Sequence, residues 1–107
     1  WAYDVRKNYL SILYNAALSL FPVLSGVDNL TASAEGELLV AEDGDDMQIV
    51  VLTADKVFPL LQVVGHDRSE ITGPAFSPDG SRLYFSSQRG KTGKLEDGMT
   101  FEVTGPF

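Results

Sequence analysis

Asp28 and Asn29 carry side-chain oxygens of the types that suit a metal ion. They stand at the start of a strand-like run, and calcium takes roughly six to eight oxygen ligands of the kind that carboxylate and amide side chains supply. The same two residues can instead form an Asx turn, in which the side-chain oxygens bond to nearby backbone as the chain enters the strand. Both interpretations stay open at this point.

Glu70 precedes a second strand-like run, Ile71 to Ala75, in the same way. If the two runs lie side by side, Glu70 can join Asp28 around one ion. The alternative is a solvated loop carboxylate near Arg68. We therefore predict Glu70 as a candidate metal ligand.

An acidic turn lies between two further apolar runs and contains Glu42, Asp43, Asp45 and Asp46. Its spacing lacks the alternating ligands and the distal glutamate of an EF-hand loop. A charged hairpin is the favoured interpretation. If one member is a metal ligand, we expect Glu42, because it ends the strand that pairs with the strand of Asp28.

The basic residues Arg89, Lys91 and Lys94 are concentrated in the glycine-containing segment 88–98. Beside a metal cluster, the guanidinium of Arg89 can bind phosphoryl oxygens and stabilise charge in a transition state. A flexible surface loop is the favoured alternative. The segment is not a Walker A motif, because the required glycine and lysine spacing fails.

His66 is the single histidine of the chain, so no multi-histidine metal site can form from these residues. It stands beside Asp67 and Arg68, and we expect it to be exposed in a loop. No Gly-x-Ser-x-Gly nucleophile elbow is present, which disfavours a Ser-His-Asp triad.

The elements that must position these residues follow from an internal repeat. Residues 30–41 align without a gap on residues 74–85, an offset of 44 residues. In this alignment Ser33 falls on Ser77, Gly36 on Gly80 and Leu39 on Leu83. Each copy predicts a hairpin. In the turn of the second copy, Pro78 sets φ, Asp79 bonds to nearby backbone and Gly80 adopts positive φ.

Two more apolar runs separate the copies, Met47 to Thr53 and Val57 to Val64, joined by a short turn at 54–56. Four antiparallel strands in about 40 to 45 residues are typical of a β-propeller blade. We therefore predict an all-β fold, a partial β-propeller of about two and a half blades.

The expected division is the end of one blade in residues 1–26, one complete blade in 27–66 and three strands of a last blade in 67–107. The first part contributes strands at Trp1 to Val5 and Tyr9 to Ala16, joined at 6–8. A competing interpretation makes Leu10 to Leu20 an amphipathic helix, because its apolar residues recur at helical spacing. The last blade lacks its fourth strand, and such a piece, with uncovered edges and faces, is expected to self-associate.

The composition narrows the classes of partner. Fifteen acidic against eight basic residues give a formal charge of -7, which disfavours nucleic acid and suits divalent cations. The chain has no cysteine, which excludes disulfides and thiolate ligands. The most apolar stretch, Leu10 to Val27, is interrupted by polar residues and Pro22, so we expect no membrane span.

Several segments resemble the C-terminal part of PhoX-type alkaline phosphatases. These are the Glu-Ile-Thr-Gly lead-in with the Ser-Pro-Asp-Gly turn in residues 69–85, the Val27 to Leu30 segment with the strand that follows it, and the closing residues 100–107. The resemblance implies a propeller with calcium and iron at its central channel, which hydrolyses phosphate esters in exported, periplasmic or secreted bacterial enzymes. It places Glu70 at an acidic position of the family and leaves much of the metal cluster outside residues 1–107.

The sequence departs from the family where a glutamine-histidine-proline-glycine segment often follows the strand, because Gln88-Arg89-Gly90 stands there instead. This departure puts catalytic competence in doubt, and we expect residues 1–107 alone to be inactive. The alternative is a non-catalytic propeller segment for protein interaction, in which Asp28 and Glu70 are structural or hold a structural calcium ion.

Overall fold

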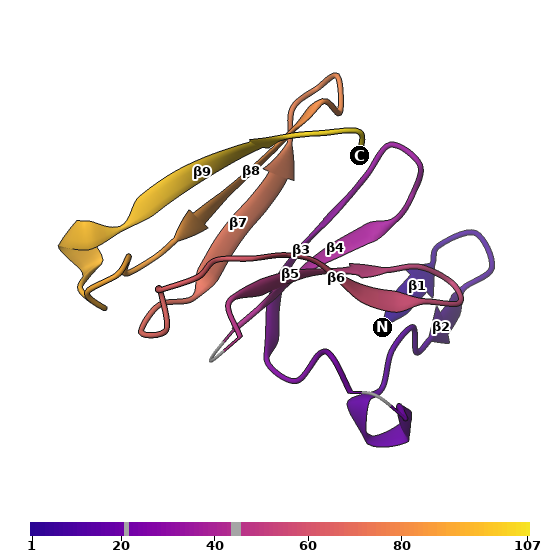
Figure 1. Ribbon diagram of the computed structural model, residues 1–107. Helices are drawn as coiled ribbons and strands as arrows, with labels where there is room; N and C mark the ends of the chain where they lie inside the picture. Colours follow the sequence, from indigo (N-terminus) through magenta and orange to yellow (C-terminus); the bar gives the residue numbers. More distant parts are fainter. Residues whose placement is uncertain (21, 44–45) are drawn as a thin grey trace.

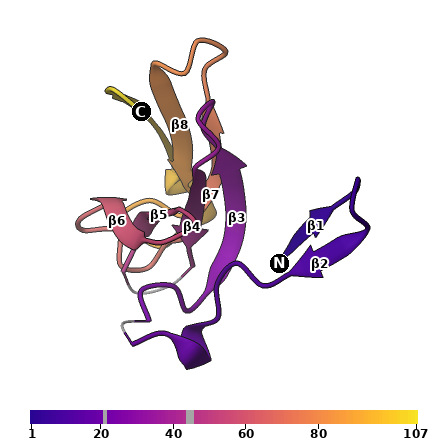
Figure 2. The same ribbon diagram turned by 90° about the vertical axis from the view of Figure 1, so that its right-hand side faces the viewer.

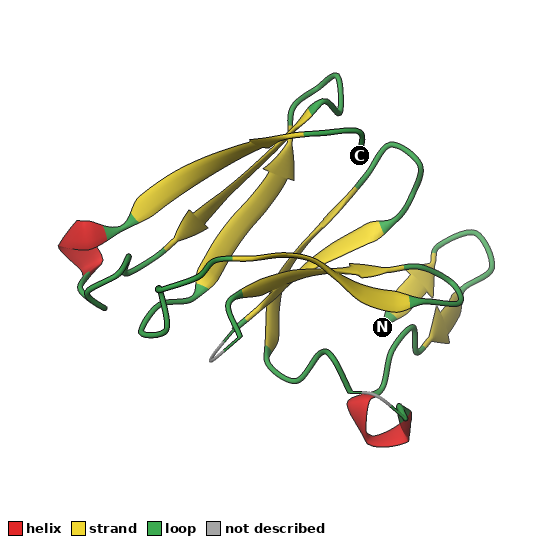
Figure 3. Ribbon diagram, viewed as in Figure 1, coloured by secondary structure: helices red, strands yellow, loops and turns green. Residues whose placement is uncertain are grey.

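The computed structural model describes residues 1–20, 22–43 and 46–107 and shows an all-β protein (Figure 1). Nine strands form three antiparallel sheets in the described residues, and the helical segments there are two single 3₁₀ turns (Figure 3). The all-β prediction is confirmed. Asp45 of the acidic turn lies outside the described residues.

The first sheet is a hairpin of β1 (Ala2–Asp4) and β2 (Tyr9–Ser11) that projects from the rest of the structure (Figure 2). The expected turn at 6–8 is present, because the Asp4 carboxylate accepts hydrogen bonds from the backbone N–H groups of Arg6 and Lys7. Asn8 completes it with a φ of 50°.

The prediction of a strand up to Ala16 and the competing prediction of a helix over Leu10 to Leu20 are both wrong. β2 ends at Ser11, and the chain then forms only the 3₁₀ turn η1 (Ala16–Leu18). The Asn15 side chain accepts a hydrogen bond from the Ala17 N–H and caps the start of this turn, which ends at Ser19, where the backbone is extended again.

The second sheet has the order β3-β4-β5-β6, formed by β3 (Val27–Ala32), β4 (Leu38–Glu42), β5 (Gln48–Leu52) and β6 (Val57–Gln62). Consecutive strands are neighbours, as hairpin connections require. The two central strands β4 and β5 are almost fully buried, because each is flanked on both sides by another strand and covered on both faces.

The third sheet has the order β7-β8-β9, formed by β7 (Ile71–Phe76), β8 (Arg82–Ser87) and β9 (Met99–Thr104). The turn between β7 and β8 has the chemistry that the sequence predicts. The Asp79 carboxylate accepts hydrogen bonds from the Ser77 hydroxyl and from the backbone and hydroxyl of Ser81, and Gly80 has a φ of 72°. A second 3₁₀ turn, η2 (Leu95–Asp97), precedes β9.

The second and third sheets pack face to face, with β7 in contact with both β3 and β4 (Figure 1). The core between them consists of aliphatic side chains from β4 and β5 together with Ile71, Leu83 and Phe85. A smaller cluster on the opposite face of the second sheet is built from Leu24, Val40, Val50 and Leu52. The three sheets do not close into a ring, so propeller character is not confirmed by the fold.

Candidate functional site

Three carboxylates approach one another where β3 and β7 meet, and we call this group, Asp28, Asp43 and Glu70, the acidic corner. Asp28 is the extra residue of a β-bulge, since Val27 pairs with Glu42 while Asn29 pairs with Ala41. Asp43 directly follows β4, and Glu70 directly precedes β7. The contact between the two sheets therefore brings the three positions together.

The pKa of Glu70 responds to both aspartates of the acidic corner. Burial raises the pKa of Glu70 above its ordinary value, and a side-chain hydrogen bond with Asp43 raises it further. The charges of Asp43 and Asp28 act in the same direction, whereas the nearby guanidinium of Arg89 opposes them. The net result is a carboxyl group that holds its proton more tightly than an isolated glutamate.

Arg89 provides the positive charge at this corner. One of its guanidinium nitrogens, Nη1, lies 3.4 Å from Glu70 Oε1 and donates to Gln88 Oε1 at 2.8 Å, while Nε donates to the backbone oxygen of Arg68 at 3.0 Å. Both members of the ion pair are largely shielded, with 33% of the Arg89 side chain and 20% of the Glu70 side chain exposed. Glu70 thus pairs with Arg89, and the alternative of a solvated carboxylate beside Arg68 does not describe it.

Asn29 contributes a bridge between the sheets. Its side-chain oxygen Oδ1 accepts a hydrogen bond from the Gly73 backbone N–H at 3.5 Å. Asn29 and Asp28 lie inside β3, and the amide oxygen of Asn29 is directed to the next sheet. The Asx-turn alternative therefore does not describe Asn29.

Glu42, the expected ligand of the acidic turn, is not brought to the acidic corner. Side chains alternate along β4, so Glu42 lies on the face of Val40, opposite to Leu39 and Ala41, which face the third sheet. Its oxygen Oε1 accepts three hydrogen bonds, from the Ser25 backbone, the Ser25 hydroxyl and the Gly26 backbone, at 2.7, 2.8 and 2.7 Å. Only 3% of Glu42 is exposed, and it holds the chain that enters β3.

Asp43 was missed as a site residue because the acidic turn was interpreted as a charged hairpin. The side-chain period of two along a strand contains the missing signal. Residues 39 and 41 face the third sheet, so residue 43 continues the same face toward Glu70. The position of Asp43 relative to a strand of the next sheet could not be derived without the packing of the two sheets.

The donor set of the acidic corner fits calcium in kind but not in number. All three side chains supply hard oxygen donors, and crowded carboxylates are stabilised by a divalent cation. Within residues 1–20, 22–43 and 46–107, however, no group of three or more acidic, histidine or cysteine side chains is arranged to hold a metal ion. Further ligands would have to complete a coordination sphere.

His66 is buried, with 3% of the residue exposed, so the expectation of an exposed loop histidine is wrong. Its Nδ1 lies 2.8 Å from Ser87 Oγ, and its ring packs edge-on against Phe101 at a centroid distance of 5.8 Å. The Ser87 hydroxyl in turn donates to Ser69 Oγ at 2.8 Å, and the backbone N–H of Arg89 donates to the same oxygen.

The direction of these bonds assigns the tautomer of His66. The Ser87 hydroxyl has one hydrogen, which it donates to Ser69. The Ser87 oxygen therefore accepts the hydrogen bond from His66, so the Nδ1 atom of His66 carries the hydrogen. Among the residues that the structure describes, no acidic side chain takes part, so the network is not a Ser-His-Asp triad. It instead ties the loop before β7 to the end of β8 and thereby fixes the backbone of Arg89.

The basic segment 88–98 is a surface segment of turns with internal hydrogen bonds, and its flexibility stays a prediction. Thr92 donates to the Asp97 carboxylate, and the Gly93 N–H donates to the Arg89 carbonyl at 3.1 Å. A Cβ at Gly90 would lie 1.9 Å from the backbone oxygen of Asp97. Lys91 and Lys94 are exposed, whereas Arg89 is the basic residue that faces the acidic corner.

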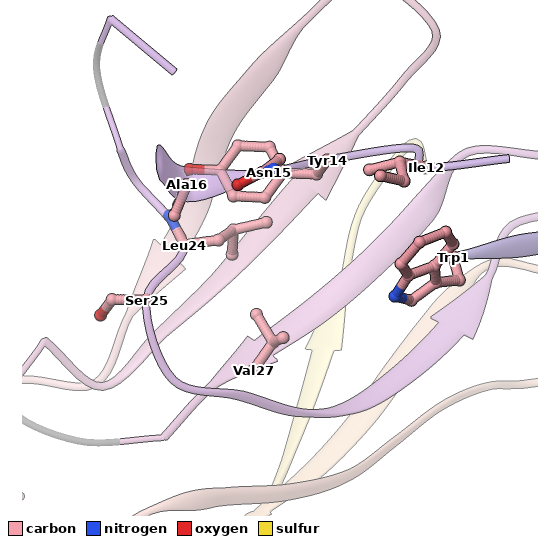
Figure 4. A pocket seen from close by; sticks show the side chains of 8 residues that line it. All are labelled: Trp1, Ile12, Tyr14, Asn15, Ala16, Leu24, Ser25 and Val27. Carbon is pink, nitrogen blue, oxygen red and sulfur yellow. Dashed lines mark hydrogen bonds between the residues drawn. The ribbon is translucent and has the colours of Figure 1, made fainter. Parts of the chain in front are cut away.

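The cleft beside Trp1 is a different kind of feature (Figure 4). It has a volume of about 350 Å³, and Tyr14, Leu24 and Val27 are among its lining residues. The Tyr14 hydroxyl, a polar group of this cleft, accepts a hydrogen bond from the Leu24 N–H at 3.3 Å. The lining contains no carboxylate or basic side chain, and the chemistry of the chain is concentrated at the acidic corner instead.

Neither of the 3₁₀ turns in the described ranges is long and apolar enough to cross a membrane as a helix. Comparisons with protein-family models, with curated proteins and with solved structures found no match to this chain.

Proposed function

We propose that this chain is the C-terminal part of a metal-dependent phosphatase that resembles the PhoX type, with the acidic corner as its contribution to a calcium site at the centre of a β-propeller. The observation that carries the proposal is the meeting of Asp28, Asp43 and Glu70 with Arg89 where β3 and β7 adjoin. Such a site combines oxygen donors for a cation with a guanidinium for a phosphoryl group.

The repeat supports a rotational relation between the two sheets. Asn29 and Gly73 are 44 residues apart, which is the repeat offset, and they are joined by a hydrogen bond. When a rotation relates two units, equivalent atoms are close together only near the axis. The first strands of the two sheets would then face the central channel, where propellers carry their ligands.

Each residue has a defined part in this proposal. Asp28, Asp43 and Glu70 would hold the cation, and Asn29 would fix the spacing of their strands. A bound calcium ion would neutralise and polarise the phosphate ester. The guanidinium of Arg89, kept in place by Arg68 and Gln88, would bind phosphoryl oxygens. Iron and the remaining ligands would come from outside residues 1–107.

The test compares calcium binding and hydrolysis of an aryl phosphate by the full-length protein with those of two variants. Glu70→Gln removes a charge from the acidic corner, whereas Glu96→Gln removes one from the exposed residue of η2. We expect calcium affinity and turnover to fall at least tenfold in Glu70→Gln alone. A full-length protein that binds no calcium and hydrolyses no ester would overturn the proposal.

One observation favours a second candidate, the non-catalytic propeller segment. Glu70 and Arg89 are already satisfied by each other and by Gln88 and Arg68. In this case the acidic corner is a structural joint between two sheets. Arg89→Lys separates the candidates, because it should reduce phosphate ester turnover in an enzyme, while in a structural joint it should alter only stability.

A further inference from the structure

One ring nitrogen of His66 is left over from the hydrogen-bond network that fixes this side chain. Because Nδ1 donates its hydrogen to Ser87, Nε2 carries a lone pair and is an acceptor. Among the residues that the structure describes, Nε2 has no hydrogen-bond partner, and Glu42 Oε2 is the only unpartnered side-chain oxygen or nitrogen that is sealed from solvent. Nε2 therefore reaches solvent, although only 3% of His66 is exposed.

The opening that His66 lines is a cleft of about 450 Å³ between the second and third sheets, and we call it the His66 cleft. This volume is within the range of roughly 300–1,000 Å³ that is typical of small-molecule sites. Its walls are mainly apolar and come from both sheets, with Leu61, Val63 and Val64 on one side and Phe85, Phe101 and Val103 on the other. The His66 cleft thus combines apolar walls with an acceptor held in a fixed orientation.

The other polar residues of the lining leave the recognition of a ligand to His66. The Glu102 carboxylate accepts a hydrogen bond from the Tyr84 hydroxyl at 2.7 Å, and the Gln62 side chain donates to a backbone oxygen at 2.9 Å. Lys91 and Glu102 place one charge of each sign at the lining, so the cleft favours an uncharged ligand. Such a ligand needs a hydrogen-bond donor, because Nε2 of His66 is an acceptor.

Aromatic rings beside the acceptor indicate the body of the ligand. Phe85 and Phe101 stack with ring centroids 5.3 Å apart, His66 packs edge-on against Phe101, and such clusters favour a further aromatic ring. We propose that the His66 cleft binds an uncharged aromatic molecule with one hydroxyl group, which donates its hydrogen to His66 Nε2. An apolar side chain in the same place would bury Nε2 without a donor, which is unfavourable. This inference is independent of the proposed phosphatase activity, because it involves no phosphoryl group.

The test measures binding of 2-naphthol and of its methyl ether to the full-length protein by calorimetry. The ether has the same two rings but no hydroxyl hydrogen to donate. We expect 2-naphthol to bind at least tenfold more tightly and to shift the nitrogen NMR signal of His66 Nε2. Equal affinity for the two probes, or binding that leaves this signal unchanged, would overturn the proposal. So would the absence of binding, which is the result if another segment of the protein or a second copy fills the cleft.

Three variants locate the binding site. His66→Phe keeps a ring but removes Nε2, so the preference for 2-naphthol over the ether should disappear. Val64 lines the cleft and is 83% exposed, so Val64→Asp should leave the fold intact and weaken binding of 2-naphthol about tenfold or more, because the carboxylate would lose water to an apolar ligand. Val5→Asp is the matched control, since Val5 is 77% exposed on the first hairpin, and should leave binding unchanged. Unweakened binding to Val64→Asp, or a preference that persists in His66→Phe, would contradict the proposal.

Discussion

The side-chain oxygen of Asn29 accepts a hydrogen bond from the backbone N–H of Gly73, the residue at the same place in the next repeat. Asn29 itself is uncharged and adds no charge to the acidic corner. Gly73 has a φ of 59°, a backbone conformation that is unfavourable in free energy for residues with a Cβ. The bond is long, at 3.5 Å, and its contribution is small compared with the apolar core between the sheets. Its significance is geometric, because it identifies the strand ends at which the two repeats converge.

The pH dependence of Glu70 provides the first prediction. Its pKa is raised above 4.5 by burial and then by Asp43, so between pH 4.5 and the raised pKa the folded state binds more protons than the unfolded state. This contribution to stability is complete below pH 4.5 and is lost as the pH rises through the folded pKa. As the pH rises from 4 to 8, the free energy of unfolding of Glu70→Gln, measured with urea, should therefore fall less than that of the wild type. Parallel pH profiles of the two proteins would contradict this.

Asp79 should show the opposite dependence. The Ser77 hydroxyl and then the backbone and hydroxyl of Ser81 lower the pKa of Asp79 from 3.8 to about 2. The charged form therefore stabilises the turn above pH 3.8, and this contribution is lost as the pH falls toward 2. The stability difference between the wild type and Asp79→Asn should be present at pH 5 and vanish near pH 2. Asp55→Asn, which alters the turn between β5 and β6, is a control for general acid effects.

The His66 network should contribute to stability through Ser87. Ser87 is fully buried and joins His66 to Ser69, so Ser87→Ala leaves two buried polar groups without this partner and should cost about 1–3 kcal/mol. Its neighbour Ser86 bonds to Thr100 on the opposite, solvent-facing side of β8. Ser86→Ala should therefore change the free energy of unfolding by less than about 0.5 kcal/mol. Equal effects of the two changes would show that the network is not the cause.

Self-association is expected through the apolar face of the second sheet that the third sheet does not cover. Leu30 is 67% exposed and lines a cleft on this face together with Val40 and Leu52. Leu30→Asp should reduce the apparent mass in sedimentation experiments at micromolar concentration, because it places a charge in the contact. Lys56→Asp, in the exposed turn between β5 and β6, is the control and should leave the mass unchanged. A monomeric wild type would contradict the prediction.

The strands of the second and third sheets could be predicted because their signals are local. The Ser77 to Gly80 turn and the alternating apolar runs require no knowledge of distant residues. The segment after Ser11 could not be predicted in this way, since its apolar residues fit both a helix and a strand, whereas the structure forms only the short turn η1 there.

The candidate site was predicted only in part, for a physical reason. Asp28 and Glu70 could be named from their place near the start of two equivalent strands, but the partners of Glu70 depend on how two sheets pack. Glu42 and Asp43 are adjacent in sequence and lie on opposite faces of the sheet, so the register of one strand determined which of them reached the acidic corner. The burial of His66 likewise depends on Ser87 and Phe101, which are distant in sequence.

The tight packing of the segment after β8 constrains how this protein can evolve. A Cβ would lie 1.9 Å from Asp97 O at Gly90, 2.8 Å from the Arg68 side chain at Gly93 and 2.8 Å from Gln88 O at Gly98. A Cβ at any of the three places would therefore force a neighbouring atom to shift, most of all at Gly90. The spacing of those glycines, together with an asparagine and a glycine 44 residues apart, is therefore a pattern by which other sequences can be tested for this same loop and sheet contact.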